Sequence, residues 1–214
     1  MSLQLFLHPL SSYCHKVLIA LYENDIAFEA KRVDDPAVAP EYEKLSPLKR
    51  FPILRDVKRG RVIPESTIII EYLEIHFPGR VGLIPKDAEL AWQVRLRDRF
   101  FDQYVHASMQ KFAADRLRPQ GQKDPYGLEE SKALFVKALG LIEAEMTDKT
   151  WAMGEAFTLA DCAAAPALYY GNRFFGPFRD THPNALAYLD RLMARPSYAR
   201  ALEEAKPFMH LLPK

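Results

Sequence analysis

The spacing of hydrophobic residues changes once along the chain, after Pro78-Gly79. Before this point, short apolar runs alternate with segments in which apolar residues recur every three or four positions, a pattern that predicts strands alternating with helices. The predicted order is strand, helix, strand, helix, hairpin, helix. The predicted strands cover 3–7, 27–33, 53–54 and 61–63, and the predicted helices begin at Ser11 or Ser12, at Tyr42 and at Glu65.

From Asp87 onward only the helical spacing occurs. We expect an α/β domain at 1–78, a linker at 79–86 and an all-helical domain at 87–214, because Pro and Gly punctuate the chain at both transitions. The second domain is predicted to hold a long helix marked by Trp92, Leu96, Phe100, Tyr104 and Val105, and further helices around 134–142, 159–170, 185–193 and 198–202.

Composition and charge narrow the classes of function. The 214 residues include 29 Lys plus Arg and 28 Asp plus Glu, a net charge of +1, whereas a nucleic-acid-binding surface needs a clustered basic excess. No window approaches the ~18 apolar residues of a membrane span, and no export signal is recognised. Two cysteines cannot form a disulfide framework, and the six histidines lack H-E-x-x-H spacing. We therefore expect a cytoplasmic protein without a metal, a membrane or a nucleic-acid partner.

The first candidate for chemistry is Ser11-Ser12-Tyr13-Cys14, where the first strand leads into the first helix. Unpaired N–H groups and the helix dipole favour an anion at such a position, and a serine hydroxyl there can donate to a thiolate. The alternative is that the serines only cap the helix. Cys14 is interpreted as a small packed hydrophobic residue rather than a nucleophile.

Two further segments adjoin predicted strands. A cis bond between Phe51 and Pro52 would turn the backbone of Phe51 outward to pair with an extended ligand, whereas a trans bond would make Pro52 an ordinary strand-entry residue. Glu65 and Ser66 begin a helix whose first N–H groups can bind a carboxylate, while Glu65 can accept from an amine. The same two residues also fit a plain helix cap.

Together these segments resemble the cytosolic glutathione transferases. The resemblance covers essentially the whole chain, including the helical domain, and implies a thioredoxin-like first domain with the order βαβαββα. Residues 11–17 resemble the catalytic-serine segment of the theta, zeta and related bacterial-type transferases. Residues 45–54 resemble their N-P-x-G-K-V-P-x-L segment, whose proline is cis, and residues 65–73 resemble their E-S-x-x-I-x-x-Y-L helix. Residues 157–161 resemble the family's N-capping box, in which Thr158 and Asp161 exchange hydrogen bonds with each other's backbone.

The resemblance implies glutathione conjugation, with glutathione as co-substrate. Ser11 would stabilise the thiolate, with Ser12 as its neighbour or substitute. Phe51 would pair by its backbone with the cysteinyl unit, and the helix that begins at Glu65 would hold the γ-glutamyl end. The glutathione-binding residues implied in this way are Arg50, Phe51, Pro52, Glu65 and Ser66.

The resemblance also implies a second substrate, a small hydrophobic electrophile, placed between the domains against the long helix. The family is usually dimeric, so we expect a homodimer. The candidate residues for the electrophile wall are Tyr13, Tyr104, His106 and Phe112.

The sequence departs from the family pattern at several positions. Lys49 replaces a usual glycine and Phe51 a small aliphatic residue, and Ser11 stands where thiol-transferase relatives carry a cysteine. Disulfide chemistry therefore lacks its first sulfur. Two alternatives to conjugation stay open: a zeta-like glutathione-dependent cis-trans isomerase, and a non-catalytic glutathione-binding regulatory protein.

Overall fold

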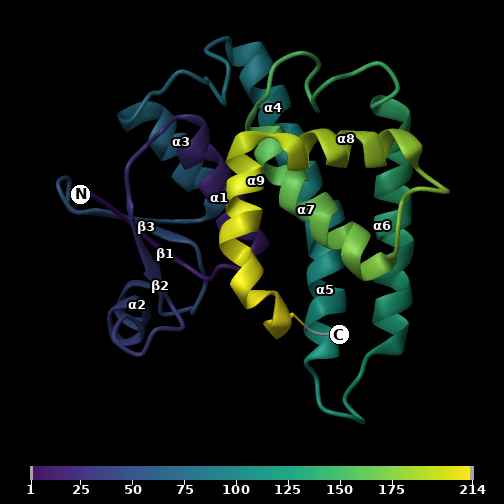
Figure 1. Ribbon diagram of the computed structural model, residues 1–214, viewed down its shortest axis with the longest axis horizontal. Helices are drawn as coiled ribbons and strands as arrows, with labels where there is room; N and C mark the ends of the chain where they lie inside the picture. The colour runs from purple at the N-terminus through teal and green to yellow at the C-terminus, as the bar shows by residue number, and fades with distance from the viewer. Residues whose placement is uncertain (1, 213–214) are drawn as a thin grey trace. The chain divides into compact units, whose positions relative to one another are not determined.

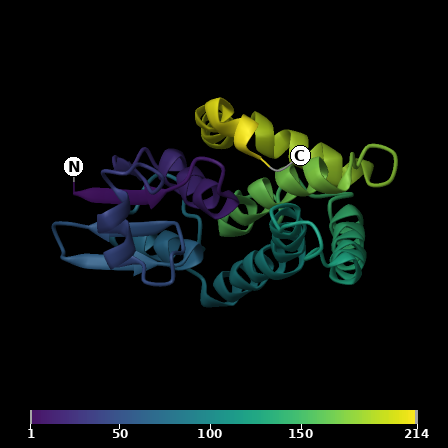
Figure 2. The same ribbon diagram turned by 90° about the horizontal axis from the view of Figure 1, so that it is seen from below.

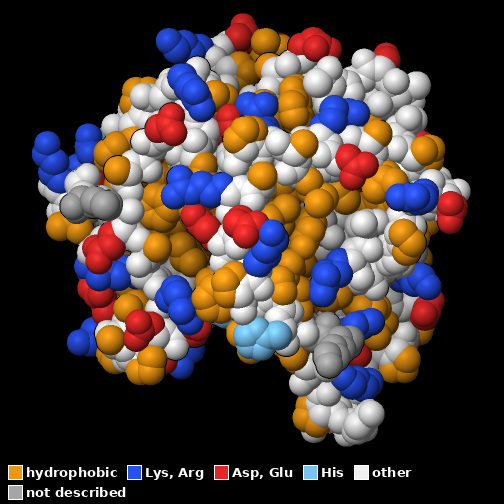
Figure 3. Space-filling model, in the orientation of Figure 1, with side chains coloured by type: hydrophobic (Ala, Val, Ile, Leu, Met, Phe, Trp, Pro, Cys, Tyr) orange, Lys and Arg blue, Asp and Glu red, His pale blue; other side chains and the backbone are white. Residues whose placement is uncertain are grey.

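The computed structural model describes residues 2–212, and the chain divides into two compact units. One unit holds the residues up to Ile84 together with Pro196–His210, and the other holds Pro85–Arg195. Among the described residues, no helix combines the length and the apolar character needed to cross a bilayer. On the face drawn in Figure 3, positive and negative side chains are interspersed with apolar ones, in keeping with the near-zero net charge.

The first unit is built on a four-stranded mixed sheet with the order β2-β1-β3-β4. Strand β1 (Leu3–Leu7) is parallel to β2 (Glu29–Arg32) and antiparallel to β3 (Ile53–Asp56), which forms a hairpin with β4 (Arg61–Pro64). The predicted strands and the predicted hairpin are confirmed, with a shorter second strand than expected.

Helices cover both faces of this sheet because alternate strand residues point to opposite sides. Phe6 of β1 packs with Tyr42 of α2 (Ala39–Leu45) on one face. Helices α1 (Ser12–Glu23) and α3 (Ser66–His76) contact each other on the other face (Figure 1). The predicted βαβαββα order is confirmed.

The second unit contains only helices. The predicted long helix runs without a break from 88 to 116, but its central turn widens into a π-helix, which the apolar spacing does not reveal. Its elements are α4 (Ala88–Phe100), the π-helix η1 (Phe101–His106), α5 (Ala107–Arg116), α6 (Pro125–Glu145), α7 (Leu159–Phe175) and α8 (Pro183–Ala194). Figure 2 shows these helices from below.

The capping box at the start of α7 is confirmed. The carboxylate of Asp161 accepts from the N–H of Thr158 at 2.8 Å, and the Thr158 side chain accepts in return from the Asp161 backbone. The other carboxylate oxygen accepts from the Ala152 N–H at 2.8 Å and from the Tyr188 hydroxyl at 2.6 Å. One buried carboxylate thereby joins α7, α8 and the segment before α7.

The last helix, α9 (Pro196–Ala205), belongs to the first unit, followed by the short 3-10 helix η2 (Lys206–Leu211). The hydroxyl of Tyr22 in α1 donates to Glu204 at 2.5 Å, and the hydroxyl of Ser197 donates to Glu23 at 2.5 Å. This division differs from the expected domain boundary, which assigned all of 87–214 to the helical domain, because these contacts attach α9 to α1. The first unit also extends to Ile84, six residues past the expected end at 78.

Candidate functional site

The sheet brings the predicted glutathione-site segments to one edge. The end of β1 lies beside the start of β3, because Phe6 pairs with Ile53, and the end of β4 lies beside the same point, because Ile53 pairs with Pro64. The segments that continue from these three strand ends carry Ser11 and Ser12, Arg50 to Pro52, and Glu65 and Ser66. Register alone therefore gathers these residues at a single edge of the first unit.

Ser11 forms the N-terminal cap of α1. Its Oγ accepts from the Cys14 N–H at 3.3 Å, and its own N–H donates to the His8 carbonyl at 3.0 Å. Ser11 is half-buried, whereas Ser12 is only 2% exposed. The cap is thus confirmed, and the Ser11 hydroxyl is the more accessible of the two.

Cys14 is fully buried below this cap. Burial raises the pKa of its thiol to about 12, although hydrogen bonds from Ser11 and from the His8 backbone oppose the shift. The thiol is therefore protonated at neutral pH and is a poor nucleophile. This agrees with the interpretation of Cys14 as a packed hydrophobic residue.

The Phe51-Pro52 bond is cis, as the resemblance implied. The Phe51 ring lies 6.1 Å from the ring of His8 and 6.3 Å from that of Tyr42, measured between centroids. Among residues 2–212, the Phe51 N–H and C=O form no hydrogen bond with another backbone group. These two groups are therefore available to pair with an extended ligand.

The segment before Phe51 is held by Ser46. Its hydroxyl donates to the Arg50 carbonyl at 2.8 Å and accepts from the Arg50 N–H at 2.9 Å, while the Arg50 side chain is exposed. Lys49 has φ +51°, a left-handed conformation that explains why the family's pattern has glycine there. Arg50 thus presents a positive charge from a position where both its N–H and its C=O are bonded to Ser46.

Glu65 and Ser66 lie where β4 turns into α3. Glu65 is exposed, adopts φ +67° and makes no side-chain cap to the helix, and Ser66 is 5% exposed. A positive φ at a residue other than glycine is costly and occurs in turns and at functional sites. The turn leaves the first N–H groups of α3 and the Glu65 carboxylate at the same edge as Ser11.

The expected electrophile-wall residues occupy different environments. Tyr13 is a half-buried residue of the first unit. In the second unit, Tyr104 is 45% exposed and His106 is 1% exposed, so the π-helix does not present them on one exposed face. Phe112 is half-buried, with the ring of Phe175 at 4.9 Å. The three second-unit residues thus do not form a single surface there.

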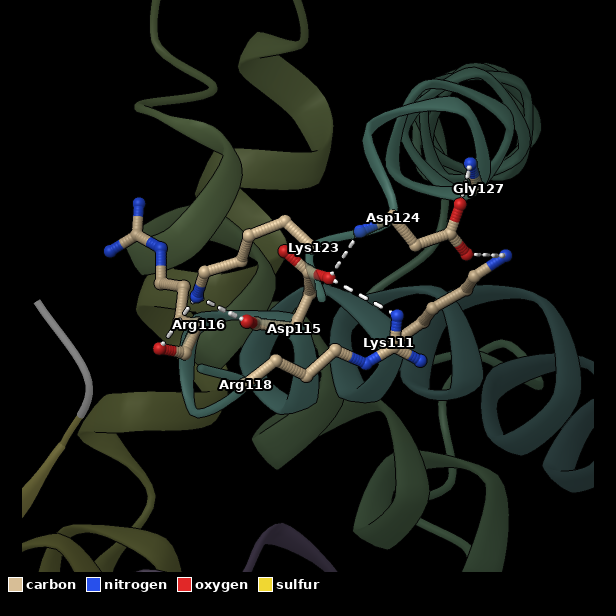
Figure 4. Close-up of polar contacts among 7 residues, drawn as sticks. All are labelled: Lys111, Asp115, Arg116, Arg118, Lys123, Asp124 and Gly127. Atoms are coloured by element: carbon tan, nitrogen blue, oxygen red, sulfur yellow. Dashed lines mark hydrogen bonds and ion pairs between the residues drawn. The ribbon is translucent and has the colours of Figure 1, made fainter. Parts of the chain in front are cut away.

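A polar network joins α5 to α6 at the other end of this helical segment (Figure 4). The buried carboxylate of Asp115 accepts from the Asp124 N–H at 2.8 Å, and Lys123 donates to the carbonyls of Asp115 and Arg116. Asp124 in turn caps α6 by accepting from the Gly127 N–H at 2.8 Å. These charges satisfy helix ends, so we interpret the network as a structural clamp.

Sequence reasoning missed the two histidines that hold the Ser11 segment. His8 Nδ1 accepts from the Leu10 N–H at 3.2 Å, and burial lowers the pKa of His8. His15 is 0% exposed in α1. The sequence pointed to these histidines only by their closeness to Ser11, because a histidine among apolar residues is usually interpreted as an ordinary core residue. Among the described residues, no group of three or more His, Cys, Asp or Glu side chains is arranged to hold a metal ion.

Comparison with known proteins identifies the family. Residues 5–81 match the family described as glutathione S-transferase, N-terminal domain, and residues 104–196 match the glutathione S-transferase, C-terminal domain. The chain belongs to the cytosolic glutathione S-transferase family. Residues 5–81 accordingly form the thioredoxin-like domain of this family, and the all-helical part follows it.

Relatives within the family carry two kinds of name. A stringent starvation protein A homolog of Haemophilus influenzae is 30% identical over 200 residues, covering 91% of this chain and 87% of the relative. Glutathione S-transferase U25 of Arabidopsis thaliana is 26% identical over 209 residues, covering 95% and 90%. A glutathione S-transferase of Methylobacterium radiotolerans, solved in complex with glutathione sulfonate, has 28% identity and a TM-score of 0.79, with 93% of each chain covered.

Proposed function

We propose that this protein binds glutathione at the sheet edge and activates its thiol for attack on a small hydrophobic electrophile. The observation that carries the proposal is the convergence of three strand ends, which places Ser11, the Phe51 backbone and the start of α3 together. Family membership and a relative solved with glutathione sulfonate support it.

Each part of glutathione has a complementary group at this edge. The γ-glutamyl carboxylate suits the first N–H groups of α3 and the Ser66 hydroxyl, and its amine suits the Glu65 carboxylate. The cysteinyl backbone pairs with the N–H and C=O of Phe51 in the manner of an added strand. Pro52 fixes the direction of that backbone, and exposed Arg50 supplies positive charge toward a tripeptide with two carboxylates.

Ser11 has the role of stabilising the thiolate. A free thiol has a pKa near ~8.5, and lowering it by about two units requires ~2.7 kcal/mol of differential stabilisation. A hydroxyl bond to a charged sulfur contributes ~1.5–3 kcal/mol and the N-terminus of α1 contributes ~0.3–1 kcal/mol. Together they contribute ~1.8–4 kcal/mol, a range that includes the required value. Ser12 is buried and acts as the neighbour rather than the donor in this proposal.

The reaction is a substitution or addition at carbon. The thiolate sulfur forms a bond to the electrophilic carbon, and either a leaving group such as halide departs with the bonding electrons or a proton is taken up by the adduct. Tyr13, a half-buried aromatic residue two positions from Ser11, is the proposed contact for an apolar electrophile. We propose that the protein works as a homodimer.

A second candidate is a non-catalytic glutathione-binding regulator, because relatives at up to 30% identity are named stringent starvation protein A homologs rather than transferases. A glutathione titration by calorimetry, followed by conjugation of an aryl halide in the same sample, separates the two. Binding with turnover supports the transferase. Binding without turnover favours the regulator or a glutathione-dependent isomerase, and the absence of binding overturns both proposals.

Substitution of Ser11 by alanine tests the thiolate role. We expect kcat/KM for aryl halide conjugation at pH 6.5 to fall by about tenfold to a hundredfold, since one pKa unit of lost stabilisation corresponds to about tenfold in thiolate. Ser11→Thr keeps both a hydroxyl and a helix cap and serves as the matched control. Full conjugation by Ser11→Ala at pH 6.5 would contradict the assignment, and a larger loss in Ser12→Ala would transfer the role to Ser12.

A further inference from the structure

The segment from His8 to Ser11 connects β1 to α1 and carries the proposed thiolate donor. Two backbone N–H groups of the segment form hydrogen bonds inside it. The Leu10 N–H donates to His8 Nδ1, and the Ser11 N–H donates to the His8 carbonyl at 3.0 Å. Pro9 has no N–H, so its carbonyl is its only polar backbone group. The hydrogen bond to this carbonyl therefore fixes the middle of the segment in place.

That carbonyl is bound by His15 from the next turn of α1. His15 Nε2 lies 2.7 Å from the Pro9 oxygen. A carbonyl oxygen only accepts, so Nε2 carries the hydrogen and the ring is the donor. The ring is 0% exposed, and burial lowers its pKa to about 4, while the Pro9 carbonyl and Glu204 oppose the shift. The imidazole is thus a neutral donor aimed at one acceptor.

Helix α9 packs against the same ring from the other side. The Tyr198 ring meets the His15 ring edge-on with centroids 6.0 Å apart. The Tyr22–Glu204 and Ser197–Glu23 hydrogen bonds join α9 to α1, and the two helices lie side by side (Figure 1). The ring is therefore enclosed between the Ser11 segment and a helix from the end of the chain.

We propose that His15 is a positioning residue for Ser11, acting through the Pro9 carbonyl to hold the Ser11 hydroxyl at the start of α1. This proposal rests on the proposed function of Ser11, and in it His15 makes no contact with glutathione. Loss of the donor would leave the carbonyl of half-buried Pro9 without this hydrogen bond, so the segment would shift toward another partner and would carry Ser11 with it.

The test compares two substitutions at His15. His15→Gln retains an N–H donor, whereas His15→Leu fills similar space without one. The pKa of the bound glutathione thiol is measured by the ultraviolet absorbance of the thiolate as a function of pH, and kcat and KM are measured alongside. We expect His15→Leu to raise that pKa by about one unit, a tenfold loss of thiolate at neutral pH, with a smaller change in KM for glutathione, and His15→Gln to retain the wild-type value.

Val17→Ala in the same helix is the matched control for lost stability, because Val17 is also 0% exposed but is not bonded to Pro9. It is expected to lower the melting temperature without moving the thiol pKa. An unchanged thiol pKa in folded His15→Leu, or an equal shift in His15→Gln, overturns the positioning role alone. A wild-type protein that does not lower the thiol pKa overturns the role of Ser11 and with it this proposal.

A measurement on the wild-type chain covers the case in which His15→Leu does not fold. Nitrogen-15 NMR of the imidazoles reports tautomer and protonation state directly. The proposal requires His15 to stay in the neutral Nε2–H form from pH 5.5 to 8. Titration of the His15 ring within that range, or the Nδ1–H tautomer, overturns it.

Discussion

Cys14 and His15 are adjacent titratable residues that burial keeps uncharged. Both are 0% exposed, and burial raises the pKa of Cys14 to about 12 while it lowers the pKa of His15 to about 4. A neutral Cys14 does not repel a substrate thiolate at Ser11, and a neutral His15 does not attract one. In the proposed mechanism the thiolate is therefore stabilised by dipoles alone: one hydroxyl and the N–H groups at the start of α1.

The same burial predicts a dependence of stability on pH. Folded His15 stays unprotonated down to about pH 4, whereas the unfolded chain binds that proton below its ordinary pKa of 6.5. The unfolded state therefore binds more protons, so the free energy of unfolding falls as pH falls from 6.5 to 4, by ~3 kcal/mol in total. Urea unfolding between pH 6.5 and 4 is expected to show a smaller fall in the free energy of unfolding for His15→Gln than for wild type. Exposed His210→Gln is the control, and parallel curves for wild type and His15→Gln would contradict the prediction.

At the scale of elements, α7 depends on one carboxylate. Asp161 is 0% exposed and accepts four hydrogen bonds, from two groups of Thr158 and from Ala152 and Tyr188. Burial raises the pKa of Asp161, while these donors oppose the shift. The acid thus serves as a helix cap and as a junction between three parts of the helical unit.

Asp161→Ala is expected to lower the free energy of unfolding by about 3 kcal/mol or more, because it leaves several buried donors without an acceptor. Chemical denaturation monitored by circular dichroism measures the loss. Asp190→Ala is the matched control, since Asp190 is an exposed acid on α8 and its removal is expected to change stability by less than about 0.5 kcal/mol. Equal stabilities for the two variants would disprove the junction role.

Elements and site differ in how far the sequence predicts them. Ser11, Phe51 and Glu65 could be predicted as site candidates because each lies within four residues of a strand end, and register then gathers them. The π-helix at 101–106 could not, since a shifted hydrogen-bond pattern leaves apolar spacing nearly unchanged. The role of His15 could not either, because its partner is a backbone carbonyl that carries no sequence signal.

At the scale of the whole molecule, the second unit leaves an apolar stripe without cover. Trp92 and Leu96 are 49% and 61% exposed, and they lie four residues apart on α4. Residues spaced in this way share a helix face. Because we propose a homodimer, we expect a second copy of the chain to cover this stripe.

Leu96→Glu is expected to convert the dimer into a monomer, because a charge buried at an apolar contact lacks a partner. Light scattering at micromolar concentration measures the mass. Leu141→Glu is the matched control, since Leu141 is a similarly exposed leucine, at 55%, on α6. A monomeric wild type, or a Leu96→Glu variant that stays dimeric, would refute the assignment of this stripe.

The attachment of α9 to α1 has a consequence for how the chain is made. The partners Tyr22 and Glu204 are 182 positions apart, and Glu23 and Ser197 are 174 apart. During synthesis the first unit therefore emerges without its last helix. The surface of α1 around His15 stays exposed until nearly the whole polypeptide has left the ribosome. A nascent chain halted before residue 196 would keep a complete sheet and an unsealed Ser11 segment, a state in which chaperones would find exposed apolar surface.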